Sequence, residues 1–251
     1  MLFRSAELLG ALEEEGIEVV LTTGGVERLT RARDHVAADL TGGRTVRVTD
    51  VLLASGRVAN IEALALDQVG VEASPRGIVV DDHQRTSVDG VWAAGDVAAG
   101  PMFTPTAQYQ ARVAVDDMFG AEERRADYAV LPAAIFTDPE LGGVGMTEAE
   151  ARAAGHEIDV VKHPLSAVTR AQFSSSRRGL YKIVFEAESR RVLGVHVVSR
   201  GASDIVGGLA PALKLGVTID DLAEVHHVYP SYSEGVKAAA ESARRSSIVA
   251  R

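Results

Sequence analysis

One stretch of the sequence, residues 86–117, limits the possible folds of this chain more than any other. At its centre an apolar run, residues 91–94, ends on Gly95 and Asp96 and is followed by a loop and a helical segment. Such a run is typical of a buried strand whose last carboxylate emerges at the carboxyl end of the strand, where open α/β sheets bind ligands. Asp96 is therefore a candidate ligand contact. The alternative is a strand, a tight turn and a capped helix that bind nothing, because Gly-Asp is a common turn pair.

The composition indicates a globular chain with an acidic surface. Of its 251 residues, 46% are hydrophobic and 24% are charged, and the net charge of −9 argues against a nucleic-acid partner. The chain contains no cysteine, which excludes disulfides, thiolate metal sites and a thiol nucleophile. No apolar run is long enough to span a bilayer and the first residues lack the pattern of a signal peptide, so we expect a cytoplasmic protein without a membrane partner.

The first half of the chain has the pattern of an α/β domain. An amphipathic helix is expected over residues 3–15, because its apolar residues recur on one face and Gly16 follows. Strands are expected at residues 17–22, 45–48, 50–54, 77–81 and 91–97.

The pattern changes after a charged stretch at residues 120–127, which is the expected linker. Antiparallel strands are expected at residues 128–136, 180–186 and 191–198, with Arg190 in the turn between the last two. Thr147 and Glu150 form a capping-box-like helix start. Further helices are expected at residues 202–215 and 236–244.

Three motifs resemble those of the pyridine nucleotide-disulfide oxidoreductases, a family of flavoproteins. Residues 93–96, Ala-Ala-Gly-Asp, are similar to the second flavin-binding motif of that family. Residues 55–60, Ser-Gly-Arg-Val-Ala-Asn, are similar to its Thr-Gly-Arg-x-Pro-Asn, although Ala59 replaces the proline. Residues 136–148 are similar to the signature Phe-Thr-x-Pro-Glu…Val-Gly-x-Thr-Glu of its interface domain.

The resemblance implies an FAD site in the first half of the chain. In the family the aspartate of the second motif hydrogen-bonds the ribityl chain of FAD, which is the role implied for Asp96. The helix that follows directs its N-terminus at the flavin ring, and a helix N-terminus suits a ring that gains negative charge on reduction. The implied cofactor-binding residues are Gly56, Arg57, Gly95, Asp96, Thr104, Thr106 and Ala107.

The resemblance also implies the domain organisation. Residues 1–120 correspond to an α/β part-domain, the C-terminal part of NAD/FAD-binding Rossmann-like domains, and residues 121–127 to a linker. Residues 128–245 correspond to an α+β dimerisation domain with an antiparallel sheet, through which a homodimer forms, and residues 246–251 to a tail. The sequence contains neither the Gly-x-Gly-x-x-Gly fingerprint nor the cysteine pair of the family. We therefore expect the C-terminal half of an FAD- and NAD(P)H-dependent enzyme, from a truncated gene or a larger protein.

Catalytic residues are expected in the segment of residues 225–235. Disulfide reductases of the family have a similar His-Pro segment, in which an imidazole moves protons at the redox disulfide of the other subunit and a glutamate orients it. Here Tyr229 precedes the proline, and Glu234 keeps the place of the glutamate. An unperturbed phenol, with a pKa of about 10, is a poor proton shuttle at neutral pH.

Two interpretations of this segment remain open. Mercuric reductases have a tyrosine at the place of Tyr229, where it contacts the metal ion, and Glu234, Gly235 and Lys237 also match their segment. Alternatively His227 replaces the missing imidazole in a dihydrolipoamide dehydrogenase-like enzyme, or the site is inactive and the chain only dimerises. The acceptor is accordingly a metal ion, a disulfide or another small molecule. The spacing of the histidines predicts no bound metal site.

Overall fold

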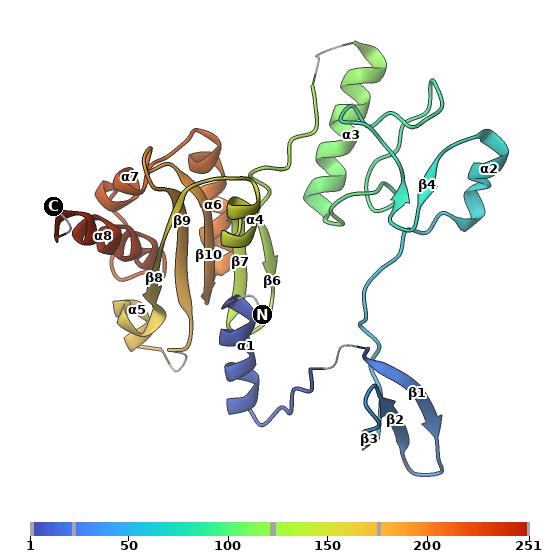
Figure 1. The fold of residues 1–251 in the computed structure, drawn as a ribbon, viewed down its shortest axis with the longest axis horizontal. Helices are drawn as coiled ribbons and strands as arrows, with labels where there is room; N and C mark the ends of the chain where they lie inside the picture. Colours follow the sequence, from blue (N-terminus) through green and yellow to red (C-terminus); the bar gives the residue numbers. More distant parts are fainter. Residues whose placement is uncertain (1–2, 22–23, 121–123, 175–176, 250–251) are drawn as a thin grey trace. The chain divides into compact units, whose positions relative to one another are not determined.

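The computed structural model describes residues 3–21, 24–120, 124–174 and 177–249, which form two compact units. One unit comprises residues 22–128, and the other combines residues 1–21 with residues 129–251. Figure 1 shows the elements of both units. The first helix, α1 (Phe3–Glu14), thus belongs to the same unit as the C-terminal half of the chain.

The unit of residues 22–128 contains an antiparallel meander, a short hairpin and one long helix. The meander pairs β1 (Val26–Arg31) with β2 (Val36–Leu40), and β2 with β3 (Thr45–Val48). The later elements of this unit are the 3-10 helix η1 (Glu62–Leu64), α2 (Leu66–Val69), the paired strands β4 (Ala73–Ser74) and β5 (Gly77–Ile78), and α3 (Thr104–Phe119).

The hairpin of this unit supports the segment that carries Gly95. The amide of Ile78 donates to the carbonyl of Val97 at 2.8 Å, and the amide of Ala99 donates to the carbonyl of Ile78 at 2.9 Å. Gly77 has a φ of 122°, and a Cβ there would lie 2.4 Å from the oxygen of Val97, so this approach requires a glycine. A small buried core lies beneath: Val71, Ile78, Ala93 and Ala98.

Three segments that the sequence predicts to be strands are not strands in the structure. Residues 17–21 and 50–54 have no regular structure, and within residues 91–97 only Trp92 forms a bridge, to Arg85; residue 22 lies outside the described residues. A strand requires a neighbour that takes its N–H and C=O groups, and residues 17–21 and 50–54 pair with none in the described parts of the chain. The apolar side chains of residues 50–54 stay exposed, 91% at Leu52 and 73% at Leu53.

The second unit is built on a five-stranded antiparallel sheet in the order β6-β7-β10-β9-β8. Its strands are β6 (Ala133–Ile135), β7 (Glu140–Gly145), β8 (Ile158–Pro164), β9 (Leu180–Glu186) and β10 (Val192–Ser199). Its other elements after α1 are α4 (Glu148–Ala153), η2 (Leu165–Ala167), α5 (Thr169–Gln172), α6 (Ala202–Lys214), α7 (Ile219–Glu224) and α8 (Glu234–Val249). The predicted antiparallel sheet is thus confirmed, and Arg190 lies in the β9–β10 turn with a φ of 60°.

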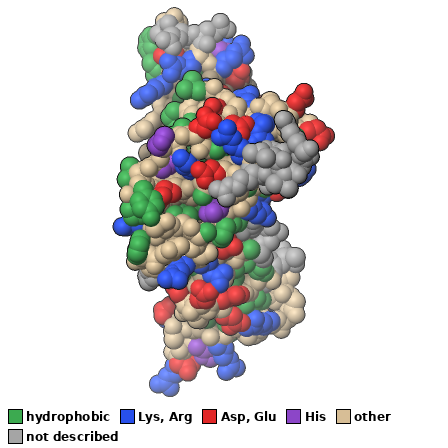
Figure 2. All heavy atoms as spheres, turned by 90° about the vertical axis from the view of Figure 1, so that its left-hand side faces the viewer, with side chains coloured by type: hydrophobic (Ala, Val, Ile, Leu, Met, Phe, Trp, Pro, Cys, Tyr) green, Lys and Arg blue, Asp and Glu red, His purple; other side chains and the backbone are tan. Residues whose placement is uncertain are grey.

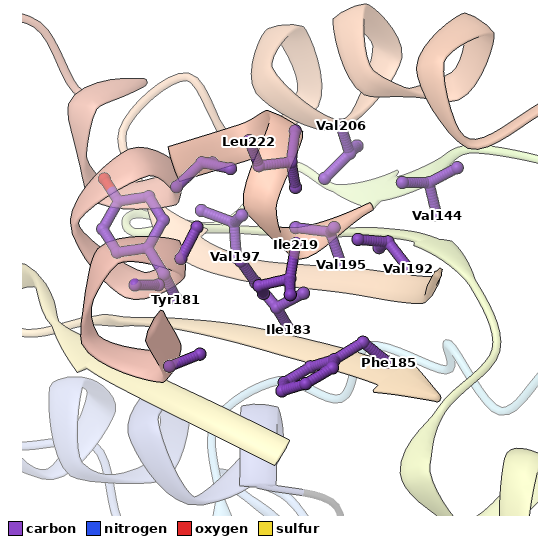
Figure 3. Packing of buried hydrophobic residues seen from close by; sticks show 14 of the residues in the cluster. Val144, Tyr181, Ile183, Phe185, Val192, Val195, Val197, Val206, Ile219 and Leu222 are labelled. Carbon is purple, nitrogen blue, oxygen red and sulfur yellow. The ribbon is translucent and has the colours of Figure 1, made fainter. Parts of the chain in front are cut away.

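Alternation along β9 divides the core of this unit into two faces. Tyr181, Ile183 and Phe185 belong to the large core that α6, α7 and α8 complete, with Val206, Ile219 and Leu222 among its members (Figure 3). Val184 points to the other face and packs with Ala151 of α4 and Ile158 of β8. The predicted capping box is present at α4, where Thr147 and Glu150 exchange both hydrogen bonds.

Helix α1 is fixed to this unit by contacts with β10 and by an ion pair between Glu14 and Arg178. A Cβ at Gly10 would meet the guanidinium of Arg178, so the side chain of Arg178 lies directly over the helix. In the described part of the chain, no helix is both long and apolar enough to cross a membrane.

Candidate functional site

The turn at Gly95 and Asp96 lies against the first turns of α3. Gly95 has a φ of 83°, and a Cβ on it would lie 3.3 Å from the Cβ of Ala107. The left-handed backbone and the close helix both favour glycine here. The turn closes with a hydrogen bond from the amide of Ala98 to the carbonyl of Gly95, at 2.9 Å. The side chain of Asp96 is 53% exposed, so its carboxylate is free to accept hydrogen bonds from a ligand.

Arg57 connects this turn to the loop before α3. Its Nη1 lies 3.4 Å from Oδ2 of Asp96, and its Nη2 donates to the carbonyl of Met102 at 2.5 Å. Gly56 precedes it with a φ of 115°. The structure therefore brings Gly56 and Arg57 to the same place as Asp96, although they are far apart in the sequence.

The first turn of α3 is open at its N-terminus. Phe103, the N-cap residue, provides no side-chain hydrogen bond, and the exposed residues Thr104 and Pro105 begin the helix. The side chain of Thr106 is fully buried, and its hydroxyl has no partner among the described residues. Free amides and a partial positive charge at this end favour an electron-rich or anionic group.

Gln110 is a residue of this site that the sequence interpretation missed. It is 1% exposed, and its Oε1 accepts a hydrogen bond from the amide of Gly95 at 2.7 Å. The signal was present, because α3 buries Thr106, Gln110, Val113 and Ala114, which recur as one helical face. A glutamine at a core position of an amphipathic helix indicates a buried hydrogen bond.

A second candidate site lies in the other unit, at the start of α8. A pocket of about 310 Å³ is lined by His226, His227, Glu234, Lys237 and Glu241, with Ala167, Val168, Thr169 and Ala238. His227 is partly buried, and this burial lowers its pKa. The charge of Lys237 lowers the pKa further, and the charge of Glu234 opposes the shift. The neutral imidazole, which can accept a proton, is therefore favoured.

Glu234 lines this pocket together with His227, whereas Tyr229 does not. The carboxylate of Glu234 accepts a hydrogen bond from the amide of Ser231 at 2.8 Å. Tyr229 is 70% exposed and does not belong to the pocket lining. The structure thus brings His227 and Glu234 to one pocket and leaves Tyr229 on the surface.

The charges and potential metal ligands of the described residues are dispersed. They include no group of three or more His, Asp or Glu residues that could hold a metal ion. On the face of the molecule in Figure 2, basic and acidic side chains are interspersed.

Two family matches cover most of the chain. Residues 4–111 match the family described as pyridine nucleotide-disulphide oxidoreductase. Residues 131–240 match the pyridine nucleotide-disulphide oxidoreductase dimerisation domain.

Curated relatives are similar to almost the whole chain. A mercuric reductase from Lysinibacillus sphaericus is 37% identical over 234 residues, which are 92% of this chain and 43% of the relative. A dihydrolipoyl dehydrogenase from Halobacterium salinarum is 40% identical over 209 residues, which are 82% of this chain and 44% of the relative. The chain therefore spans somewhat less than half the length of these two relatives.

Solved structures have a similar fold. The flavoprotein disulfide reductase RclA from Escherichia coli matches with a TM-score of 0.85 at 27% identity, over 94% of this chain and 54% of that one. LpdA from Mycobacterium tuberculosis matches with a TM-score of 0.86 at 28% identity, over 96% and 53% of the two chains.

Proposed function

Because this chain belongs to the pyridine nucleotide-disulphide oxidoreductase family, whose members depend on FAD and NAD(P)H, we propose that it is the C-terminal portion of such an enzyme. The whole enzyme passes electrons from NAD(P)H through FAD to a metal ion or a disulfide. Residues 1–120 contribute to the cofactor domains, and residues 128–245 form the dimerisation domain. The exposed apolar segments at residues 17–21 and 50–54 support this proposal, because they are strand-like sequences without a neighbouring strand.

The observation that carries the flavin assignment is the meeting of Arg57, Asp96 and the open N-terminus of α3. Asp96 would accept hydrogen bonds from the hydroxyl groups of the ribityl chain, and Arg57 would hold the carboxylate in place. Gly95, Thr104, Thr106 and Ala107 would shape the helix end that faces the ring. Bound flavin would supply the two-electron chemistry that these side chains lack.

The second pocket supports a role in proton or metal handling for a partner subunit. In a disulfide reductase, His227 would accept and return the proton of a thiol, because its pKa is lowered and the neutral form predominates. In a mercuric reductase-like enzyme, exposed Tyr229 would contact the metal ion, and Glu234 would fix the segment through Ser231.

Both branches have support among the relatives. The names mercuric reductase and dihydrolipoyl dehydrogenase both occur among relatives of similar identity. A Cu(II) complex has been solved for RclA, which is itself a flavoprotein disulfide reductase. We favour the mercuric reductase-like branch because Tyr229, Glu234, Gly235 and Lys237 match its segment.

Dimerisation is proposed through the unit that contains residues 129–251. Several large apolar side chains of this unit are exposed, among them Phe136 at 80%, Leu215 at 88% and Val228 at 79%. Covering these side chains with a second subunit would remove their apolar surface from water, which favours association.

The flavin assignment is tested by the visible absorption of the purified chain after incubation with FAD and gel filtration. We expect a flavin band that remains with the protein, and about tenfold weaker FAD binding for Asp96→Ala. The matched control is Asp89→Ala, which removes an exposed aspartate elsewhere in the unit and should bind FAD as the wild type does. A colourless protein that elutes as a dimer would favour the alternative, a dimerisation fragment without catalysis.

A further inference from the structure

Gln110 connects the flavin-site turn to the end of the linker. Its side-chain amide is buried between two groups, with Oε1 2.7 Å from the amide nitrogen of Gly95 and Nε2 2.8 Å from the hydroxyl of Tyr128. A side-chain amide accepts hydrogen bonds at its oxygen and donates them from its nitrogen, so the N–H of Gly95 fixes which way the Gln110 side chain is turned. The Tyr128 hydroxyl then accepts from Nε2.

The surroundings of Gln110 leave little freedom of movement. A Cβ on Gly100 would lie 3.3 Å from Nε2 of Gln110, so the chain passes closely over the amide. The other side of Tyr128 is fixed by Tyr109, whose ring meets it edge to face with the centroids 6.2 Å apart. Tight packing around a satisfied buried amide holds one arrangement.

Tyr109 in turn fixes the end of the linker. Its hydroxyl donates to the carbonyl of Arg125 at 3.1 Å and accepts from the amide of Asp127 at 3.0 Å. Arg125 also contacts the carboxylate of Asp82 at 2.8 Å. Residues 124–128 therefore form an ordered support beside α3, and Tyr128 is its contact with Gln110.

We propose that Gln110 is a positioning residue for the flavin site, and that Tyr128 sets its orientation. Glycine has the most flexible backbone of all residue types, so Gly95 alone does not fix this turn. The Asp96 carboxylate can hydrogen-bond a ribityl chain only if the turn is held in one conformation. The hydrogen bond from Gly95 to Gln110 fixes it, and the support of residues 124–128 holds Gln110. The inference rests on the proposed flavin site for its function and on the two hydrogen bonds of Gln110 for its geometry.

The geometric part is tested without any flavin, by hydrogen exchange of the Gly95 amide measured by NMR. We expect Gln110→Met, which keeps length and helix propensity but cannot accept this bond, to speed Gly95 exchange about tenfold. Gln110→Glu keeps the acceptor and should leave the exchange near the wild-type rate, with Tyr128 now donating to the carboxylate. Tyr128→Phe should speed it about threefold, because the orientation of the amide loosens.

The matched control is Gln108→Met, which changes the same residue type at an exposed position of the same helix. Gly95 exchange in this control should equal that of the wild type. Equal rates in the wild type and in Gln110→Met, or an equal increase in both glutamine variants, would overturn the positioning role. If Gln110→Met does not fold, the Tyr128→Phe measurement decides, and an unchanged Gly95 rate there overturns the part assigned to Tyr128.

The functional part is tested by FAD affinity, followed through quenching of flavin fluorescence. We expect about tenfold weaker binding for Gln110→Met and wild-type binding for Gln110→Glu and Gln108→Met. A wild-type chain that binds no FAD would contradict the proposed flavin site and leave the amide-exchange result to stand. If the wild type binds FAD and Gln110→Met binds it with the same affinity, this would instead contradict the positioning role alone.

Discussion

At the scale of single residues, Tyr181 and Gly235 join the sheet to the segment that holds the candidate catalytic residues. Tyr181 is fully buried, which raises the pKa of its phenol, and its hydroxyl donates to the carbonyl of Tyr232 at 2.7 Å. The ring lies directly over Gly235, where a Cβ would be 2.2 Å from Cε2. The start of α8 is therefore fixed by a contact that leaves no room for a larger residue.

This contact reverses the usual effect of replacing a helical glycine with alanine. In a helix this change normally stabilises by about 0.5–1 kcal/mol, and Gly208→Ala, on α6 with open space around the new Cβ, should do so. Gly235→Ala should instead lower the free energy of unfolding by about 1–3 kcal/mol, because the buried ring must move. Urea denaturation of both variants measures this. If both variants have a higher free energy of unfolding than the wild type, the Tyr181 ring moves aside at little cost.

His163 provides a residue-scale test of stability against pH. Its Nε2 is buried without a partner among the described residues, and burial lowers its pKa. The unfolded chain therefore binds a proton more readily, so this stability is present above about pH 6.5 and is lost as the pH falls through the folded pKa. His163→Phe should weaken the decline in thermal midpoint just below that pH, and exposed His226→Phe should not. If His163→Phe shows the same decline in thermal midpoint as the wild type, the decline is caused by other titrating groups.

The sequence predicted some site residues and not others, for physical reasons. Asp96 and Arg57 follow from local motifs, and the structure places them 3.4 Å apart. The partner of Gln110 could not be read from the sequence, because the bond to Gly95 depends on how the turn folds back on α3. The Glu234–Ser231 bond was missed because a motif gives the identity of a residue and not its hydrogen-bond partner.

At the scale of elements, α3 is fixed at its far end as well as at its start. Asp117, in its last turn, accepts hydrogen bonds from Nε of Arg85 at 2.7 Å and from the indole of Trp92 at 2.8 Å. Trp92 is thus a half-buried connector between α3 and the segment that carries Gly95. The helix cannot shift along its axis without breaking this cluster of Asp117, Arg85 and Trp92.

The cluster gives a pH-dependent prediction for α3. The hydrogen bonds from Arg85 hold the pKa of Asp117 below its usual range, so its stabilisation is present above about pH 3.9 and is lost as the pH falls through the folded pKa. Asp117→Asn should therefore lower the thermal midpoint at neutral pH, and the difference from the wild type should shrink in acid. Asp89→Asn, at an exposed position, should leave the midpoint unchanged. A difference that is constant with pH would contradict the role of the charge.

The success of the element predictions depended on whether a partner strand lies in the same chain. The strands at residues 180–186 and 191–198 were predicted within a residue of β9 and β10, because alternation and a hairpin turn are local signals. The segments at residues 17–21 and 50–54 carry similar apolar signals but have no described neighbour to pair with. Alternation of apolar and polar residues specifies which face of a strand is buried, whereas the pairing of that strand depends on its neighbours in the sheet.

At the scale of the whole molecule, the two units differ in how much apolar surface each buries. The sheet unit has a continuous core that reaches from β9 to α6, α7 and α8 (Figure 3). Within the described part of residues 22–128 the buried cluster around Ile78 and Ala98 is small, and the meander strand β1 is exposed along its length. Since burial of apolar surface dominates stability, the sheet unit should be the more stable of the two.

Hydrogen exchange should therefore resolve two levels of protection, and the level of α1 is the decisive observation. By sequence order α1 belongs with the less stable unit, but its contacts with β10 and the Glu14–Arg178 pair place it in the other. Its amides should be protected more than those of β1–β3. Arg178→Ala should release α1 without affecting β9, whereas Arg76→Ala, at an exposed arginine of the other unit, should not. Uniform protection across both units would show that they unfold together, and unprotected α1 amides in the wild type would show that this helix does not belong to the sheet unit in solution.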